Sequence, residues 1–99
     1  MGQMLVYTNP VDGRDAEYNR WYDEVHIPEV LTVAEFTAAK RFRLADAQVF
    51  ADQPFRYLAI YEYAGTADAA VNALMKASST FEMSDAMDGT THVVLFEER

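Results

Sequence analysis

A tyrosine, an aspartate and a histidine share one short stretch of the sequence, at a spacing that suits proton transfer. Tyr22 and His26 are four residues apart, and Asp23 and His26 are three apart, so their side chains are neighbours on a helix. A carboxylate beside an imidazole fixes its tautomer and favours its charged form. Because histidine exchanges protons near neutral pH, Tyr22, Asp23 and His26 are the candidate catalytic residues. The alternative is that His26 only hydrogen-bonds a free backbone carbonyl or caps the helix as a cation.

Further polar and aromatic side chains are candidates for holding a substrate near His26. Asn19 is seven residues from His26 and shares its helical face. Trp21 lies on another stripe, and either lines a pocket or packs in the core or an interface. His92 is the only other histidine, and it points either into the same pocket or to a subunit interface. The candidate substrate-binding residues are Trp21, Asn19, Tyr7, Phe81 and His92.

Other kinds of site find no support in the residue types present. The chain has no cysteine, which excludes disulfides, thiolate catalysis and Cys-ligated metal centres. The two histidines lack the spacing of a metal site, and no glycine-rich phosphate loop or serine nucleophile motif occurs. We therefore expect neither a metal nor a cofactor. Lys40, Arg41 and Arg43 form a basic run that we expect to pair with Glu62 and Glu97 on other strands.

The charge balance of the chain argues against several kinds of partner. Its 99 residues carry 8 Lys and Arg against 16 Asp and Glu, a net charge of -8. Nucleic acids and anionic membranes are bound by clustered cations, which this composition does not favour. No apolar run approaches the roughly 20 residues of a membrane span, and the first residues lack the pattern of a signal peptide. We expect a cytoplasmic protein that binds neither nucleic acid nor membranes.

The candidate catalytic residues lie on a predicted helix that is kinked near its end. Apolar and aromatic residues recur at helical spacing over residues 14–31. Asp12 or Asp15 is suited to cap the start of this helix. Pro28 removes one backbone donor, so we expect a kink in the turn just before it.

The remaining elements give the chain the order β-α-β-β-α-β. Thr66 is a good N-cap for a second helix. Strict alternation places Phe36 on the same face of its strand as Phe42, and Phe55 on the same face as Tyr57. The predicted second helix covers residues 68–77, the predicted strands cover residues 3–8, 36–45, 55–63 and 91–97, and a short helical turn is expected over residues 84–88.

This order is typical of the ferredoxin-like α+β fold, a four-stranded antiparallel sheet with two helices on one face. Residues 1–99 are long enough for one such domain. Both faces of the sheet are predicted to be apolar, yet two helices cover only one of them. A second copy of the sheet is the simplest cover, so we expect a homodimer through the sheet face. The alternative is that tyrosine-rich faces tolerate solvent because each ring carries a hydroxyl.

The helix motif resembles that of the dimeric α+β barrel superfamily, and most of all that of its EthD-like group. About a third of the chain carries this resemblance. The family usually has Pro-Gly before the phenylalanine that follows the helix, where this chain has Val33-Ala34-Glu35, so the turn departs from the pattern. The residues that carry the resemblance are Trp21, Tyr22, His26 and Pro28 within residues 18–31, followed by Phe36, Arg41 and Phe42.

The resemblance implies a ferredoxin-like subunit and a dimer whose two sheets pack face to face into a barrel. Relatives in this superfamily include polyketide cyclases, muconolactone isomerases, dehydratases, cofactor-free monooxygenases and members without known chemistry. The enzymes among them bind apolar, oxygenated small molecules between helices and sheet. The helix histidine, here His26, is the acid/base residue that the resemblance suggests.

Three functions are compatible with these observations. The first is a cofactor-independent lyase, isomerase or cyclase that acts on an aromatic or polyketide-like carbonyl compound. In it His26 moves a proton at the carbon next to the carbonyl, Tyr22 hydrogen-bonds the enolate oxygen, and Asp23 orients His26. The second is a cofactor-free monooxygenase that uses the same residues and consumes oxygen. The third is a non-catalytic ligand-binding or stress-related dimeric module.

Overall fold

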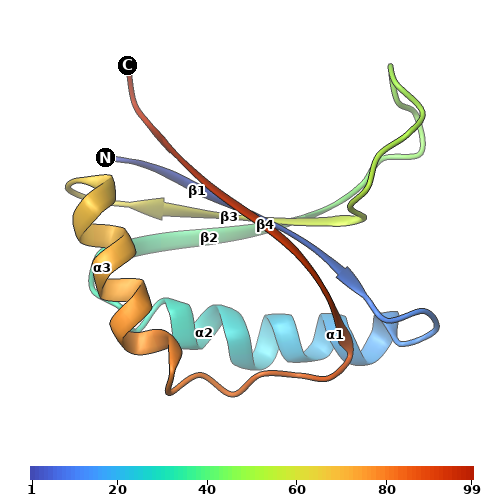
Figure 1. The fold of residues 1–99 in the computed structure, drawn as a ribbon, viewed down its shortest axis with the longest axis horizontal. Coiled ribbons are helices and arrows are strands. Elements are labelled where there is room, and N and C mark those ends of the chain that lie inside the picture. Colours follow the sequence, from blue (N-terminus) through green and yellow to red (C-terminus); the bar gives the residue numbers. More distant parts are fainter.

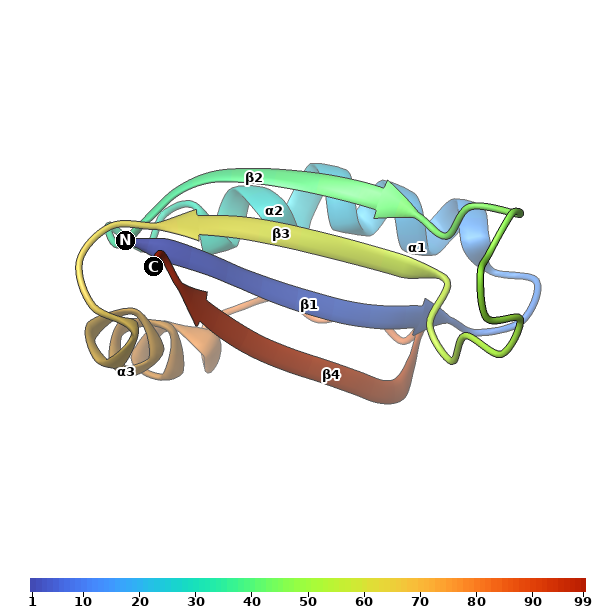
Figure 2. The same cartoon turned by 90° about the horizontal axis from the view of Figure 1, so that it is seen from above.

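The computed structural model describes residues 1–99, and its strands and helices follow one another in the predicted order (Figures 1 and 2). A long first helical stretch follows the first strand, and a shorter helix precedes the last one. The strands are β1 (Gly2–Pro10), β2 (Phe36–Arg43), β3 (Tyr57–Tyr63) and β4 (Met87–Glu97), and the helical segments are α1 (Asp15–Trp21), η1 (Tyr22–His26), α2 (Ile27–Val30) and α3 (Ala67–Ser78).

All four strands form one antiparallel sheet in the order β2-β3-β1-β4. The first helical stretch and α3 lie on the same side of this sheet and form one helical layer, as Figure 1 shows. The register places Val6 of β1 opposite Ala59 of β3 and Val93 of β4, so these side chains face the helices together. The predicted ferredoxin-like α+β fold is confirmed. No helix in the structure is long and apolar enough to cross a bilayer.

The first helical stretch changes its winding where the sequence predicts a kink. Residues 22–26 form a π turn, η1, in which the backbone N–H of Ile27 donates to the carbonyl of Tyr22. Pro28 is the second residue after this turn, and its ring cannot fit against the carbonyl four residues earlier in a regular α-helix. The wider turn accommodates the proline without ending the helix. Arg14 lies at the N-cap without a capping side chain, so the predicted cap by Asp12 or Asp15 is wrong.

Two predicted strand faces are wrong because the backbone departs from strict alternation. The register of β2 shifts between Phe36 and Ala38, and this bulge turns Phe36 into the core opposite Tyr63. Phe55 precedes β3 and lies near Tyr7 on the sheet face away from the helices, with ring centroids 5.8 Å apart. Residues 84–88 form no helix, because β4 begins earlier than predicted, at Met87.

The hydrophobic core lies between the helices and the sheet. Its largest fully buried side chains are Tyr18, Tyr22, Tyr61, Tyr63 and Val30. The other side of the sheet, which we call the open face, has no element packed on it (Figure 1). Phe42 and Phe96 on that face are exposed in the single chain.

The segment after the second helix runs alongside the first helical stretch. Thr66 caps α3 as predicted, since its side chain accepts a hydrogen bond from the backbone N–H of Ala69 over 3.1 Å. After α3, residues 79–86 run along the first helical stretch to the start of β4 (Figure 1). We call residues 79–86 the strap.

Candidate functional site

His26 lies at the end of the π turn, packed among aromatic rings. Its imidazole stacks on the indole of Trp21, with ring centroids 4.8 Å apart, and meets the ring of Tyr22 edge-on at 5.0 Å. Phe81 of the strap approaches from the other side, at 6.0 Å. The Nδ1 atom of His26 is buried and has no hydrogen-bond partner.

Burial lowers the pKa of His26 below its ordinary value, because a charged imidazole is poorly solvated there. The carboxylate of Glu29 acts in the opposite direction, and the guanidinium of Arg41 lowers the pKa further. The expectation that the carboxylate of Asp23 favours charged His26 is therefore wrong, because Asp23 is not among the groups that shift this pKa and burial outweighs the effect of Glu29. The site holds a neutral imidazole near neutral pH, the form that accepts a proton.

The hydroxyls of Tyr22 and Tyr61 are buried close to each other, and neither has a hydrogen-bond partner. Burial raises the pKa of Tyr22 to about 12, with the neighbouring Tyr18 adding to the effect. Burial also raises the pKa of Tyr61, and its neighbour Tyr22 raises it further. Both phenols therefore stay protonated at neutral pH. They are hydrogen-bond donors that no protein acceptor uses.

Arg41 extends from β2 into the space between the sheet and the first helical stretch. Its Cζ atom lies 4.3 Å from the ring centroid of Tyr22, within cation–π range. One guanidinium nitrogen lies 2.9 Å from the carboxylate of Asp23, and another donates to the side-chain oxygen of Asn19 over 2.9 Å. The side chain is only 14% exposed, and its Nε atom has no partner.

These unpartnered atoms form a single group. Four buried side-chain nitrogens or oxygens lack a hydrogen-bond partner in the whole chain, and all of them lie around Tyr22. They belong to His26, Tyr22, Tyr61 and Arg41, which we call the His26 cluster. An unsatisfied buried polar group costs about 1–3 kcal/mol, so four in one place require an explanation. The hollows of about 730 and 400 Å³ in the surface are lined by other residues, so a ligand that satisfies these four atoms has to displace part of the packing around them.

Asp23 lies beside the cluster, but the predicted contact between Asp23 and His26 is absent. Its carboxylate forms an ion pair with Arg41 and is 63% exposed. The prediction assumed α-helical spacing, in which residues three apart lie on the same face. In the wider π turn, Asp23 and His26 no longer lie on the same face. Asp23 is therefore placed to orient Arg41 and not His26.

The structure brings three of the five predicted substrate-binding residues to the cluster. Trp21 is stacked on His26 and donates its indole N–H to the backbone carbonyl of Glu82 over 2.8 Å. Phe81 approaches His26 from the strap. Asn19 accepts from Arg41 and also donates to the hydroxyl of Tyr57 over 3.3 Å.

Tyr7 and His92 lie on the open face, on the other side of the sheet from His26. They are opposite each other in the β1–β4 register, and their rings are 5.6 Å apart. Alternation explains this, since the even-numbered residues of β1 face the helices and Tyr7 is odd-numbered. Together with Phe55 they line a hollow of about 730 Å³. His92 and His26 therefore do not share a pocket, and no group of three His, Asp or Glu side chains is placed to hold a metal ion.

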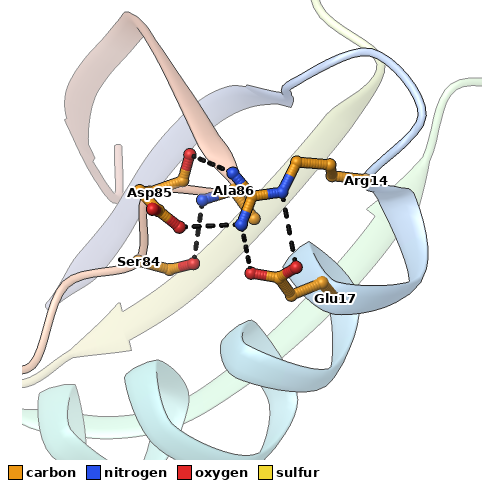
Figure 3. Close-up of polar contacts among 5 residues, drawn as sticks. All are labelled: Arg14, Glu17, Ser84, Asp85 and Ala86. Carbon is orange, nitrogen blue, oxygen red and sulfur yellow. Dashed lines mark hydrogen bonds and ion pairs between the residues drawn. The ribbon is translucent and has the colours of Figure 1, made fainter.

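Side-chain contacts hold the strap against the first helical stretch. The carboxylate of Glu29 accepts the backbone N–H of Glu82 at 2.9 and 3.1 Å. Arg14 forms ion pairs with Glu17 and Asp85, as Figure 3 shows. Because the strap carries Phe81, these contacts also fix the aromatic cover of His26.

Arg41 and Tyr61 are the two cluster members absent from the predicted site. The basic run was expected to pair with Glu62 and Glu97, but Arg41 pairs with Asp23. The reason is that Arg41 and Glu62 lie on opposite faces of the sheet. Arg41 is two residues from the small Ala39, so both side chains lie on the same face of β2. This spacing is the signal that Arg41 faces inward, although alternation alone does not say which face the helices cover.

Comparison with known proteins gives relatives by fold. No protein-family model and no curated protein matches this sequence. The Arabidopsis thaliana protein At3g17210 is similar in structure, with a TM-score of 0.73 and 10% identity over 100% of this chain and 96% of that chain. An EthD (ethyl tert-butyl ether d) family protein from Bacillus halodurans has a TM-score of 0.57 and 13% identity, covering 100% of both chains. A protein from Shewanella loihica proposed to be a monooxygenase has a TM-score of 0.58 and 12% identity, covering 100% of this chain and 97% of that one.

These identities establish the fold and leave the activity open. The resemblance predicted from the helix motif is confirmed at the level of the fold, which this chain shares with an EthD family protein and with a protein proposed to be a monooxygenase. The chain has the ferredoxin-like α+β fold, which it shares with At3g17210 and with the EthD family protein from Bacillus halodurans.

Proposed function

We propose that this protein is a cofactor-independent enzyme that moves a proton on an apolar carbonyl compound, with His26 as the base. The observation that carries the proposal is the His26 cluster, in which every unpartnered buried polar atom of the chain is gathered around Tyr22, and one of them belongs to a neutral imidazole. Perturbed pKa values and unsatisfied polar groups concentrate at functional sites. Lyase, isomerase and cyclase reactions all begin with such a proton transfer.

The cluster supplies both parts that this chemistry needs. Neutral His26 takes the proton from the carbon next to the carbonyl, and negative charge then develops on the carbonyl oxygen. The hydroxyl of Tyr22 and the Nε–H of Arg41 are donors without partners, and we assign them to that oxygen. Asp23 and Asn19 position Arg41 by hydrogen bonds.

The substrate class follows from the surroundings of the cluster. The rings of Trp21, Tyr22 and Phe81 around His26 favour an aromatic or polyketide-like molecule. The unpartnered donors call for a substrate that presents oxygen acceptors. Phe81 belongs to the strap, so we propose that substrate enters by displacing this segment.

We also propose that the protein works as a homodimer through the open face. Phe42 and Phe96 are exposed there in the single chain, beside the 730 Å³ hollow. A contiguous apolar surface of this kind is typical of an interface. A two-fold arrangement covers both copies at once. The cysteine-free sequence is consistent with the cytoplasmic location that we propose for it.

The experiment that tests the proposed activity is hydrogen exchange at carbon. Purified protein is incubated in D2O with a panel of ketones that carry an aromatic ring, phenylacetone first, and loss of the α-proton signal is followed by NMR. We expect exchange above the buffer rate, and His26→Gln lowers it by about 100-fold or more. His92→Gln is the matched control and keeps the wild-type rate, because His92 lies on the open face.

Two other outcomes decide against the proposal. Ketones that raise the unfolding temperature without any exchange indicate a non-catalytic binding module. Oxygen consumption that depends on His26, measured with an oxygen electrode, indicates a cofactor-free monooxygenase. The Shewanella loihica protein of the same fold is proposed to be a monooxygenase.

A further inference from the structure

The connection between β2 and β3 is a long projection whose tip packs against no other element of the chain. Residues 44–56, which we call the arm, rise from the end of the sheet on the side away from the helices (Figure 1). Val49 and Phe50 at its tip are 92% and 77% exposed. Two adjacent apolar side chains displayed in this way are costly for a chain that stays alone in water.

The base of the arm is fixed to the sheet, so its direction is set by the fold. The side chain of Asn9 on β1 donates to the carbonyl of Pro54 over 2.9 Å and accepts the backbone N–H of Arg56 over 2.8 Å. The backbone N–H of Leu44 donates to the carbonyl of Arg56 over 2.7 Å and closes the base. The arm is therefore held in place at its base while its apolar tip remains uncovered.

The charges on the arm and on the sheet edge next to it are complementary and unused. Asp46 and Asp52 flank the tip, and neither forms an ion pair within the chain. Lys40 on β2 lies on the open face next to the exposed Phe42, and it forms no ion pair. The apolar arm tip with its two acids thus matches the exposed Phe42 with Lys40 beside it.

We propose that the arm tip of one copy packs on the sheet face of a second copy, as a clasp across the dimer. The inference rests on the proposed homodimer and adds the residues that hold it together. Self-complementarity favours a second copy over another partner, because one chain carries both the apolar tip with its two acids and the exposed Phe42 with Lys40 beside it. Each dimer then contains two equivalent clasps, and each buries Val49 and Phe50.

The test compares the dimer dissociation constant of wild-type protein and of a double variant, Val49→Asp with Phe50→Asp, by analytical ultracentrifugation over a dilution series. We expect the wild-type chain to be a dimer and the double variant to dissociate at least about 100-fold more readily. Met75→Asp is the matched control, because Met75 on α3 is 69% exposed but lies on the helical layer. Circular dichroism confirms that each variant is folded.

A second readout uses the absence of cysteine from the chain. Phe50→Cys labelled with an environment-sensitive fluorophore is expected to shift its emission to shorter wavelength as the protein dimerises. A wild-type chain that stays monomeric overturns both the clasp and the proposed homodimer. A double variant that dimerises as tightly as wild type, or a label that shows no shift on dimerisation, overturns the clasp alone.

Discussion

The imidazole of His26 stacks on the indole of Trp21, with ring centroids 4.8 Å apart and planes inclined by 22°. Trp21 is fixed in turn by the hydrogen bond from its indole N–H to the carbonyl of Glu82 in the strap. The orientation of His26 is therefore set by aromatic packing and by the strap, and a carboxylate plays no part in it.

Trp21→Phe tests this support. The variant keeps an aromatic ring under His26 but loses the hydrogen bond to the strap, so we expect the free energy of unfolding to fall by about 1 kcal/mol. Urea unfolding followed by circular dichroism measures it, since the variant removes the only tryptophan of the chain. Faster amide exchange in residues 79–86 is also expected, and an unchanged strap contradicts the account.

Removing an unpartnered hydroxyl should cost activity but not stability. Tyr61→Phe deletes a buried polar atom that has no partner, so we expect an unchanged free energy of unfolding or a gain of about 1 kcal/mol. Tyr18→Phe is the matched control, because the hydroxyl of Tyr18 shares a buried hydrogen bond with Thr8 and its loss should destabilise the protein. A Tyr61→Phe variant that is less stable than Tyr18→Phe contradicts the assignment of Tyr61 to a ligand.

The lowered pKa of His26 makes stability depend on pH in a defined direction. The unfolded chain takes up a proton as pH falls through about 6.5, while folded His26 does so only at lower pH. The free energy of unfolding should therefore decline as pH falls below this value, until the folded pKa is reached. Urea titrations of wild type and His26→Gln isolate the effect, and an equal decline in both proteins contradicts it.

Asp23→Asn separates the two roles considered for this carboxylate. The exposed ion pair with Arg41 contributes at most about 1 kcal/mol to stability, so the variant should fold normally. Its α-hydrogen exchange rate should fall because Arg41 is no longer oriented. The pKa of His26, followed by NMR, should not change. A lower His26 pKa in the variant would show that Asp23 acts on the imidazole after all.

The fold and the helix that carries the site were predictable because their signals are local. Helical spacing, the breaking effect of Pro28 and the capping by Thr66 each act within a few residues. The predicted kink before Pro28 is present as the π turn.

The partners across the site were not predictable, because they depend on long-range geometry. Asp23 was assigned to His26 on α-helical spacing, and the π turn moved it to Arg41, 18 residues away in sequence. The bulge near Phe36 reversed one strand face, and alternation carries no sign of such a bulge. Tyr7 and His92 were grouped with His26 because the sequence does not show which face of β1 the helices cover.

The most direct test of the central claim is the pH profile of α-hydrogen exchange with phenylacetone. We predict a rate that rises with pH and is half-maximal below about pH 6.5, since neutral His26 is the base and its pKa is lowered. This rise of the exchange rate with pH should be absent in His26→Gln. A profile that His26→Gln shares with wild type, or a rate that rises as the imidazole becomes protonated, contradicts the account.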